Sequence, residues 1–140
     1  DYPAAVLALG GTSVTERGTH AADSFFQGMF QTALADGEII TAVHFPKPSA
    51  FAYAKFRHPA SRYALAGVAV ARTAGAVRVA VTGVAYSVFR WTEAEDAIAA
   101  GAPLPALVRD DINSDIHASS DYRAHLAQVM LARALKGIAA

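Results

Sequence analysis

The stretch FAYAKFRHPASRYALAGVAVARTAGAVRVAVTGV, residues 51–84, decides the fold of this chain. Its runs of apolar and β-branched residues predict three strands, at residues 51–58, 65–72 and 77–84. Pro59 and Ser61 break the first strand, and Ala74-Gly75 predicts a turn between the second and third strands. Because short connections join antiparallel neighbours, we expect an antiparallel meander.

The third strand of this meander alternates in polarity. Three valines, at positions 77, 79 and 81, alternate with Arg78, Ala80 and Thr82. Successive side chains of a strand point to opposite faces of the sheet. The pattern therefore predicts one buried face and one more exposed face.

The same stretch gathers cations and tyrosines between two apolar runs. Lys55 and Arg57 precede the break, and Arg62 and Tyr63 follow it directly. One interpretation is a surface that presents cations and an aromatic ring to a flat anionic ligand. The alternative is a surface hairpin with ordinary solvated charges, because loops are usually polar.

Shorter elements are expected before the meander. Asp1 predicts the cap of a helix that Gly10-Gly11 ends. Further elements follow in order: a strand over residues 12–17, a short helix over 25–30, a turn at 35–37 and a strand over 38–45. The helical spacing of Phe25, Phe26, Met29 and Phe30 favours a buried helix face.

Two helices are expected after the meander. Thr92 predicts the cap of a helix over residues 93–100, which Gly101 ends. Ser119-Ser120 marks the start of a long last helix. Arg123 and Arg133 lie on that helix, and a structural contact is the favoured reading of both, because arginines on helices often span to neighbouring elements.

Composition narrows the possible functions. The 140 residues include 54% hydrophobic residues and equal numbers of acidic and basic side chains, 12 of each. One globular domain, or one domain with part of a neighbour, is expected, without the net charge that would attract nucleic acid or an anionic membrane. No apolar run approaches the ~20 residues of a membrane span, and we expect a soluble, cytoplasmic protein.

Several kinds of catalytic site lack their sequence support. The chain has no cysteine, so a redox centre would have to be a bound organic cofactor. The five histidines show no i, i+4 pair, and a metal site is not expected. There is no G-x-S-x-G, P-loop or G-x-G-x-x-G motif.

Ordered motifs along the chain resemble one family. The run ADSFFQGMFQTALADGEII at residues 22–40, followed by Pro46, resembles the FF-x-G…T-x-L…GE-I-I…P signature of FAD-binding medium subunits of the molybdenum hydroxylases. These include aerobic carbon monoxide dehydrogenase and the flavin domain of xanthine dehydrogenase. The segments YAKFR at 53–57, ASRYA at 60–64, DYR at 121–123 and LARAL at 131–135 are similar to later parts of that family.

The resemblance implies a chain that is half of a longer one. Family members are roughly twice this length and place their glycine-rich, phosphate-binding loops in an N-terminal half. Since the chain starts at Asp1 rather than Met, we interpret it as a piece of a longer polypeptide. The expected fold is α+β: residues 1–48 end an FAD-binding subdomain, and residues 49–140 form a C-terminal domain with a small antiparallel sheet of three or more strands packed against helices.

The resemblance also implies part of a flavin site. Asp1 would lie near the ribityl or phosphate region of FAD, Leu34 would pack against the flavin ring, Lys55 would approach it, and Tyr63 would lie over or beside it. No catalytic side chain is implied. Molybdenum cofactor and iron–sulfur clusters would belong to a large and a small partner subunit, from which electrons reach FAD and an external acceptor. The segment AYSVFR at 85–90 departs from the family, where a small, proline-containing segment is common.

Two other functions are compatible with the sequence. A non-catalytic assembly module could keep the fold and dock partner subunits without binding flavin. An unrelated small enzyme could use Ser61 and His58, although no readable motif supplies an acid to orient the histidine. If the family reading holds, this chain alone is expected to be an inactive fragment of an oxidoreductase subunit.

Overall fold

The computed structural model describes residues 1–73 and 75–139 of the chain. Its helices are α1 (Tyr2–Leu9), α2 (Ala22–Phe25), α3 (Thr92–Ala100) and α4 (Ser120–Ile138). Its strands are β1 (Thr12–Thr15), β2 (Thr19–Ala21), β3 (Phe26–Gly28), β4 (Gln31–Thr32), β5 (Ile40–His44), β6 (Ala50–Arg57), β7 (Ala64–Thr73), β8 (Ala76–Thr82) and β9 (Phe89–Arg90). The α+β prediction is confirmed.

The main sheet is the predicted meander with a fourth strand added. Its order is β6-β7-β8-β9, and every neighbouring pair is antiparallel. The pairing of β7 with β8 extends to Thr73 and Ala76. Ala74, which belongs to the predicted turn, lies outside the described residues.

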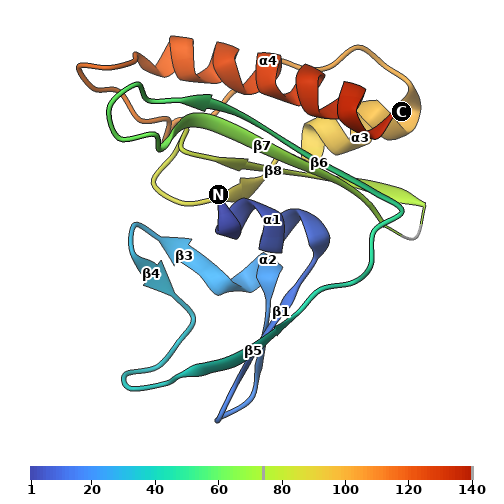
Figure 1. Cartoon of the computed structure of the whole chain (residues 1–140). Helices are drawn as coiled ribbons and strands as arrows, with labels where there is room; N and C mark the ends of the chain where they lie inside the picture. Colours follow the sequence, from blue (N-terminus) through green and yellow to red (C-terminus); the bar gives the residue numbers. More distant parts are fainter. Residues whose placement is uncertain (74, 140) are drawn as a thin grey trace.

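Both faces of this sheet are covered, including the face of the third strand that the sequence predicts to be the more exposed one. Figure 1 shows α4 across one face and α1 against the other. Val68 and Val70 pack in one core with side chains of α3 and α4, whereas Ala69 and Ala80 pack on the other face against α1. The small alanine side chains allow close approach of α1, so Ala80 is fully buried although Arg78 and Thr82, on the same face of the strand, are polar.

A smaller layer lies on the side of α1 away from the main sheet (Figure 1). It contains a three-stranded antiparallel sheet of order β2-β1-β5 and the β3–β4 hairpin. The turn predicted at 35–37 is confirmed by the backbone hydrogen bond from Glu38 N to Ala35 O at 3.0 Å.

The prediction of a helix over residues 25–30 is wrong. The helix α2 ends at Phe25, and the chain continues as a hairpin in which Phe26 pairs with Thr32. Phe25 is buried, but Phe30 is fully exposed at a φ of 54°, which no helical residue adopts. Cross-strand pairing therefore overrides the helical spacing of the aromatic side chains.

The ends of the other helices lie where the sequence predicts them, with one exception. The Ser119 hydroxyl accepts a hydrogen bond from Tyr122 N at 3.2 Å, which confirms the start of α4. Thr92, however, is the first residue of α3, and Trp91 occupies the cap position. The buried Trp91, whose backbone N–H bonds Val79 O at 2.9 Å, anchors this end to the sheet and shifts the start of the helix.

The structural reading of Arg123 is confirmed. Its guanidinium is buried and donates to the backbone oxygens of Leu65 and Gly83, both at 3.0 Å, and to Oδ2 of Asp115 at 2.6 Å. These bonds tie α4 to the sheet.

In the part of the chain that the structure describes, neither α4 nor any other helix is long and apolar enough to cross a membrane.

Candidate functional site

Asp1, Tyr53 and Lys55 meet where the start of α1 lies against β6. The Lys55 ammonium donates to Oδ2 of Asp1 at 2.5 Å, and the Tyr53 hydroxyl donates to Oδ1 at 2.6 Å. Tyr53 and Lys55 are two residues apart on one strand, so both side chains point to the face that α1 covers. Asp1 occupies the cap position of α1 but makes no side-chain cap bond there.

Burial differs across this cluster. The side chain of Lys55 is 15% exposed and that of Asp1 is 51% exposed, so the ion pair is accessible from the carboxylate side. Burial also raises the pKa of the Tyr53 phenol, which stays a neutral hydrogen-bond donor at physiological pH. Gly67 makes room for the phenol, because a Cβ there would lie 2.5 Å from the Tyr53 oxygen.

Tyr63 lies at the connection between β6 and β7. The residue is 80% exposed, and its carbonyl accepts from His58 N at 2.8 Å. The preceding residue, Arg62, has a φ of 63°, which turns the chain sharply. The connection therefore presents the Tyr63 ring to the surroundings of the domain.

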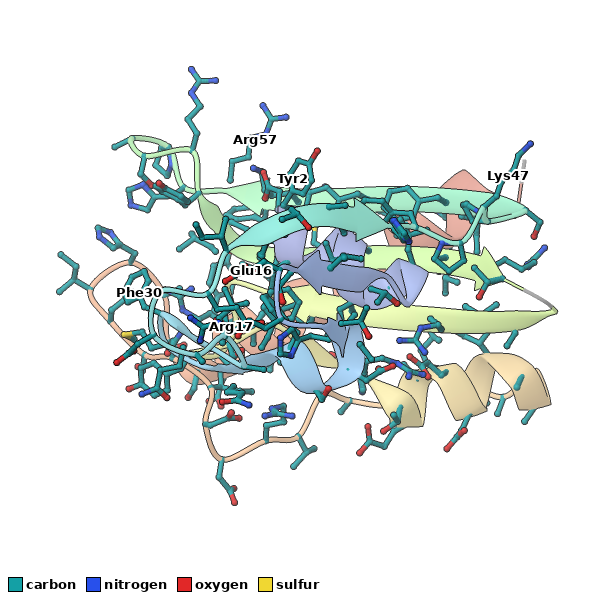
Figure 2. The ribbon with its side chains drawn as sticks, turned by 90° about the horizontal axis from the view of Figure 1, so that it is seen from below. Tyr2, Glu16, Arg17, Phe30, Lys47 and Arg57 are labelled. Atoms are coloured by element: carbon teal, nitrogen blue, oxygen red, sulfur yellow. The ribbon has the colours of Figure 1, made fainter. Side chains whose placement is uncertain are left out.

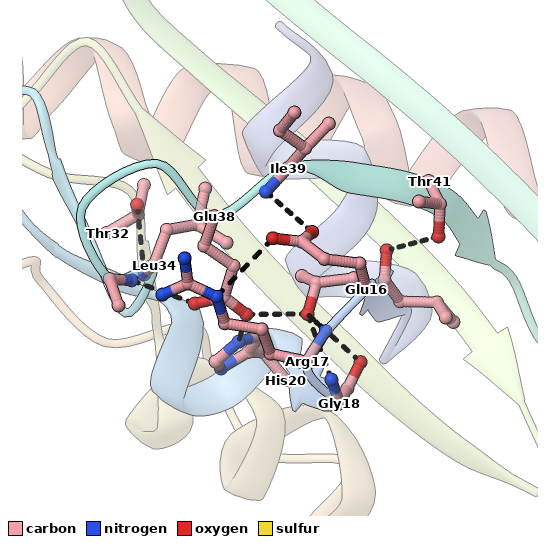
Figure 3. A network of polar contacts seen from close by, with 12 residues as sticks. Glu16, Arg17, Gly18, His20, Thr32, Leu34, Glu38, Ile39 and Thr41 are labelled. Carbon is pink, nitrogen blue, oxygen red and sulfur yellow. Dashed lines mark hydrogen bonds and ion pairs between the residues drawn. The ribbon is translucent and has the colours of Figure 1, made fainter.

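Leu34 lies in the loop that follows β4 and is half-buried. Its backbone N–H donates to the Thr32 hydroxyl at 3.4 Å. The same loop closes on Glu38, whose carboxylate accepts hydrogen bonds from two other elements (Figure 3). Polar contacts of Thr32 and Glu38, which flank Leu34 in the sequence, therefore hold the loop that carries it.

The structure joins only two of the four predicted site residues directly, Asp1 and Lys55. Among the described residues, no hydrogen bond or ion pair links Leu34 or Tyr63 to that pair. Their roles at a ligand stay predictions.

Sequence reasoning missed Tyr53 as a contact of Asp1 and Glu38 as a contact of the loop that carries Leu34. The spacing of Tyr53 and Lys55 on one strand is a signal that could have identified the first. Glu38 forms hydrogen bonds with His20 and Thr15, which lie 18 and 23 positions earlier in the chain. No short-range sequence pattern predicts such contacts.

A groove of about 600 Å³ lies beside the β3–β4 hairpin. Residues 82, 83, 85–88 and Asn113 line it together with Pro3 and the hairpin, and none of these lining side chains is charged. It includes part of the segment in which the sequence departs from the resembled family. Phe30 belongs to this groove, and Figure 2 shows Phe30 and Lys47 near opposite ends of the molecule.

The contacts of His58 are those of a turn residue. Its Nδ1 accepts from the backbone N–H groups of Ala60 and Ser61, both at 3.2 Å. The Ser61 hydroxyl accepts from Tyr63 N at 3.4 Å. These bonds stabilise the connection after β6 and give the serine no activating base within the described residues.

Curated relatives match the chain over most of its length, although no protein-family model matches it. It is 35% identical over 154 residues to the nicotine 6-hydroxylase medium subunit of Paenarthrobacter nicotinovorans, which covers 96% of this chain and 54% of that subunit. It is 31% identical over 134 residues to the carbon monoxide dehydrogenase medium chain of Afipia carboxidovorans. This match covers 83% of this chain and 46% of that one.

Solved structures of similar enzymes also match the fold of this chain. Reconstituted CO dehydrogenase from Oligotropha carboxidovorans matches with a TM-score of 0.78 and 27% identity, over 99% of this chain and 56% of that one. A cyanide-inactivated Cu,Mo-CO dehydrogenase matches with a TM-score of 0.80 over the same shares of the two chains and with the same identity. Quinoline 2-oxidoreductase from Pseudomonas putida 86 shares the fold, with a TM-score of 0.76 at 23% identity.

The chain spans about half the length of the curated relatives it matches. Within that half, sequence and fold agree, and the resemblance drawn from the motifs is confirmed. The chain is therefore a homologue of the medium subunits of carbon monoxide dehydrogenase and nicotine 6-hydroxylase, over about half of their length.

Proposed function

We propose that this chain is the C-terminal half of an FAD-binding medium subunit and supplies one side of its flavin site. In this proposal residues 1–48 complete the FAD-binding domain and residues 49–140 form the C-terminal domain. The observation that carries it is Lys55, a largely buried cation held by Asp1 in a chain homologous to such subunits. An ammonium group has three N–H donors, so Lys55 can bond a ligand while it keeps Asp1.

Each proposed contact has a separate task. Asp1 would bind the ribityl or phosphate region, Leu34 would pack on the flavin ring, and Tyr63 would lie over or beside it. Lys55 would stand near the flavin and favour the anionic reduced form by its charge. When bound, FAD would supply the redox chemistry, and no side chain of this chain needs to transfer a proton.

Partner subunits complete the proposal. Electrons would arrive from iron–sulfur clusters on a small subunit, after oxidation at a molybdenum centre on a large subunit, and would leave FAD for an external acceptor. The absence of cysteine from this chain fits a piece that ligates no cluster. We place the complex in the cytoplasm and expect the 140-residue chain by itself to be inactive.

The test uses the intact subunit, which is this chain together with its proposed N-terminal half. Purified protein should be yellow, and heat-released cofactor should co-elute with FAD on a chromatographic column. An intact subunit that is colourless and stays so after incubation with FAD would show that the proposal is wrong.

A docking module without flavin is the second candidate, and the β3–β4 hairpin favours it. Phe30 is fully exposed and Met29 is 51% exposed beside the uncharged groove. Exposed apolar side chains around a groove are typical of contact with another protein. The module reading predicts that the intact subunit assembles with its partners while containing no flavin.

A further inference from the structure

The Glu38 carboxylate is an acceptor for three separate groups (Figure 3). Oε1 accepts from the Thr15 hydroxyl at 2.5 Å and lies 2.9 Å from His20 Nε2. Oε2 accepts from the backbone N–H of Ala35 at 2.8 Å. Two of these groups belong to the β1–β2 hairpin, and the third belongs to the loop that carries Leu34.

This arrangement buries the Glu38 side chain although its loop is exposed. The side chain of Glu38 is 5% exposed, whereas residues 35–37 of the same loop are all exposed. Hydrogen bonds from His20, Thr15 and the Ala35 N–H lower the pKa of Glu38 to about 2. The carboxylate is therefore charged at any physiological pH, and its bonds are of the stronger, charge-assisted kind.

A second carboxylate holds the end of the loop. Glu16 accepts from the backbone N–H of Ile39 at 2.8 Å. On the other side of Leu34, the Thr32 hydroxyl accepts from Leu34 N. The segment from Thr32 to Ile39 is thus held by hydrogen bonds at its start, at its turn and at its end, and Leu34 itself donates the first of these bonds.

We propose that Glu38 is a positioning residue for the flavin site, because it holds the loop in the form that presents Leu34 to the ring. The inference rests on the proposed function, since Leu34 is the side chain expected to contact the flavin. Glu38 itself touches no flavin in this proposal. It acts through the loop, from the side of the β1–β2 hairpin.

The experiment compares Glu38→Gln with Asp36→Asn in the intact subunit. Asp36 lies in the same loop with an exposed side chain, so its variant loses the same charge without losing these bonds. We expect Glu38→Gln to weaken FAD binding about tenfold and to shift the visible band and the reduction potential of the flavin. Asp36→Asn should change none of these.

A double-mutant cycle with Leu34→Ala separates positioning from a general loss of stability. If Glu38 acts through Leu34, Glu38→Gln should have little further effect on FAD affinity once Leu34 is truncated. Independent, additive effects would overturn the proposal. So would Glu38→Gln protein with shifted loop amides in its NMR spectrum but unchanged flavin affinity and potential.

His20→Phe provides a milder variant if Glu38→Gln does not fold. It keeps an aromatic ring beside Phe25, which His20 contacts at a centroid distance of 5.9 Å, and removes one donor to Glu38. We expect a smaller change in the same direction, and no change would contradict the proposal. Wild-type subunit without flavin would refute the proposed function itself, which distinguishes the two failures.

Discussion

The Lys55 ammonium lies 2.5 Å from Oδ2 of Asp1, a residue 54 positions earlier in the chain. The other oxygen of the same carboxylate accepts the Tyr53 hydroxyl. The start of α1 is therefore bound to β6 through both oxygens of one side chain. A ligand that reaches Lys55 meets an ion pair that is already oriented, and little rearrangement is needed to bind it.

Replacement of Lys55 by Met should weaken FAD binding by the intact subunit about tenfold, since a hydrogen bond to a charged group is lost. The flavin potential should also fall, because the reduced anion loses a nearby cation. Equilibrium titration with FAD and a redox titration measure the two effects. Arg57→Met is the matched control, because Arg57 is an exposed cation at the end of the same strand. Equal affinity and potential in Lys55→Met and wild type would remove Lys55 from the site.

Glu38 should make the stability of the chain depend on acid. Its pKa is about 2 in the folded state and 4.5 ordinarily, so between these values the unfolded chain binds a proton that the folded chain does not. This contribution to the free energy of unfolding is complete above pH 4.5 and is lost as the pH falls toward 2. Urea denaturation at several pH values measures it.

Glu38→Gln lacks this titration, so its difference from wild type should shrink as the pH falls from 4.5 to 2. Comparison of the two proteins cancels the other carboxylates with lowered pKa, which are Asp23, Asp111 and Asp115. A difference that stays constant over this range would contradict the role of the Glu38 hydrogen bonds.

Gly83→Ala should destabilise the fold by about 3 kcal/mol, from left-handed strain together with overpacking. Gly83 has a φ of 79°, and a Cβ at this position would overlap the backbone oxygen of Ala64. Gly101→Ala is the control. Gly101 has a φ of 64° with open space around it, so only the strain of about 1 kcal/mol applies. Thermal and urea unfolding should rank the two variants in this order, and equal losses would rule out the overlap.

Arg123→Met should cost about 3 kcal/mol, because one buried and one partly buried backbone oxygen lose their donor. Those oxygens belong to Leu65 and Gly83, which lie in and beside the main sheet. Arg133→Met, an exposed change on the same helix, should stay within about 0.5 kcal/mol of wild type. Similar stability of the two variants would mean that α4 is held by its apolar face alone.

Regular elements could be predicted where local pattern and tertiary packing agree. The strands of residues 51–84 are close to their expected bounds, since alternating β-branched residues suit an extended chain whatever surrounds it. The long last helix begins where expected because Ser119 caps it through a bond only three residues away. Both signals are confined to neighbouring residues.

The segment at residues 25–30 shows where such signals fail. Helical spacing of its aromatic side chains is compatible with a helix, but Phe26 pairs with Thr32 and Phe30 points away from any core. The alternation of β8 likewise predicts Ala80 on the more exposed face, but α1 packs against that face and buries Ala80. In both cases a partner distant in sequence or a cross-strand bond outweighs the local preference.

By itself the sequence determined the α+β class, the meander, the cap of α4 and the resemblance to medium subunits, since these depend on short-range pattern and on ordered motifs. Tertiary structure alone decided that Asp1 pairs with Lys55 and that Glu38 closes the Leu34 loop. The physical reason is distance along the chain. Hydrogen bonds and ion pairs form between groups a few ångströms apart, and only the packing of α1 on β6, and of the loop on the β1–β2 hairpin, brings these residues together.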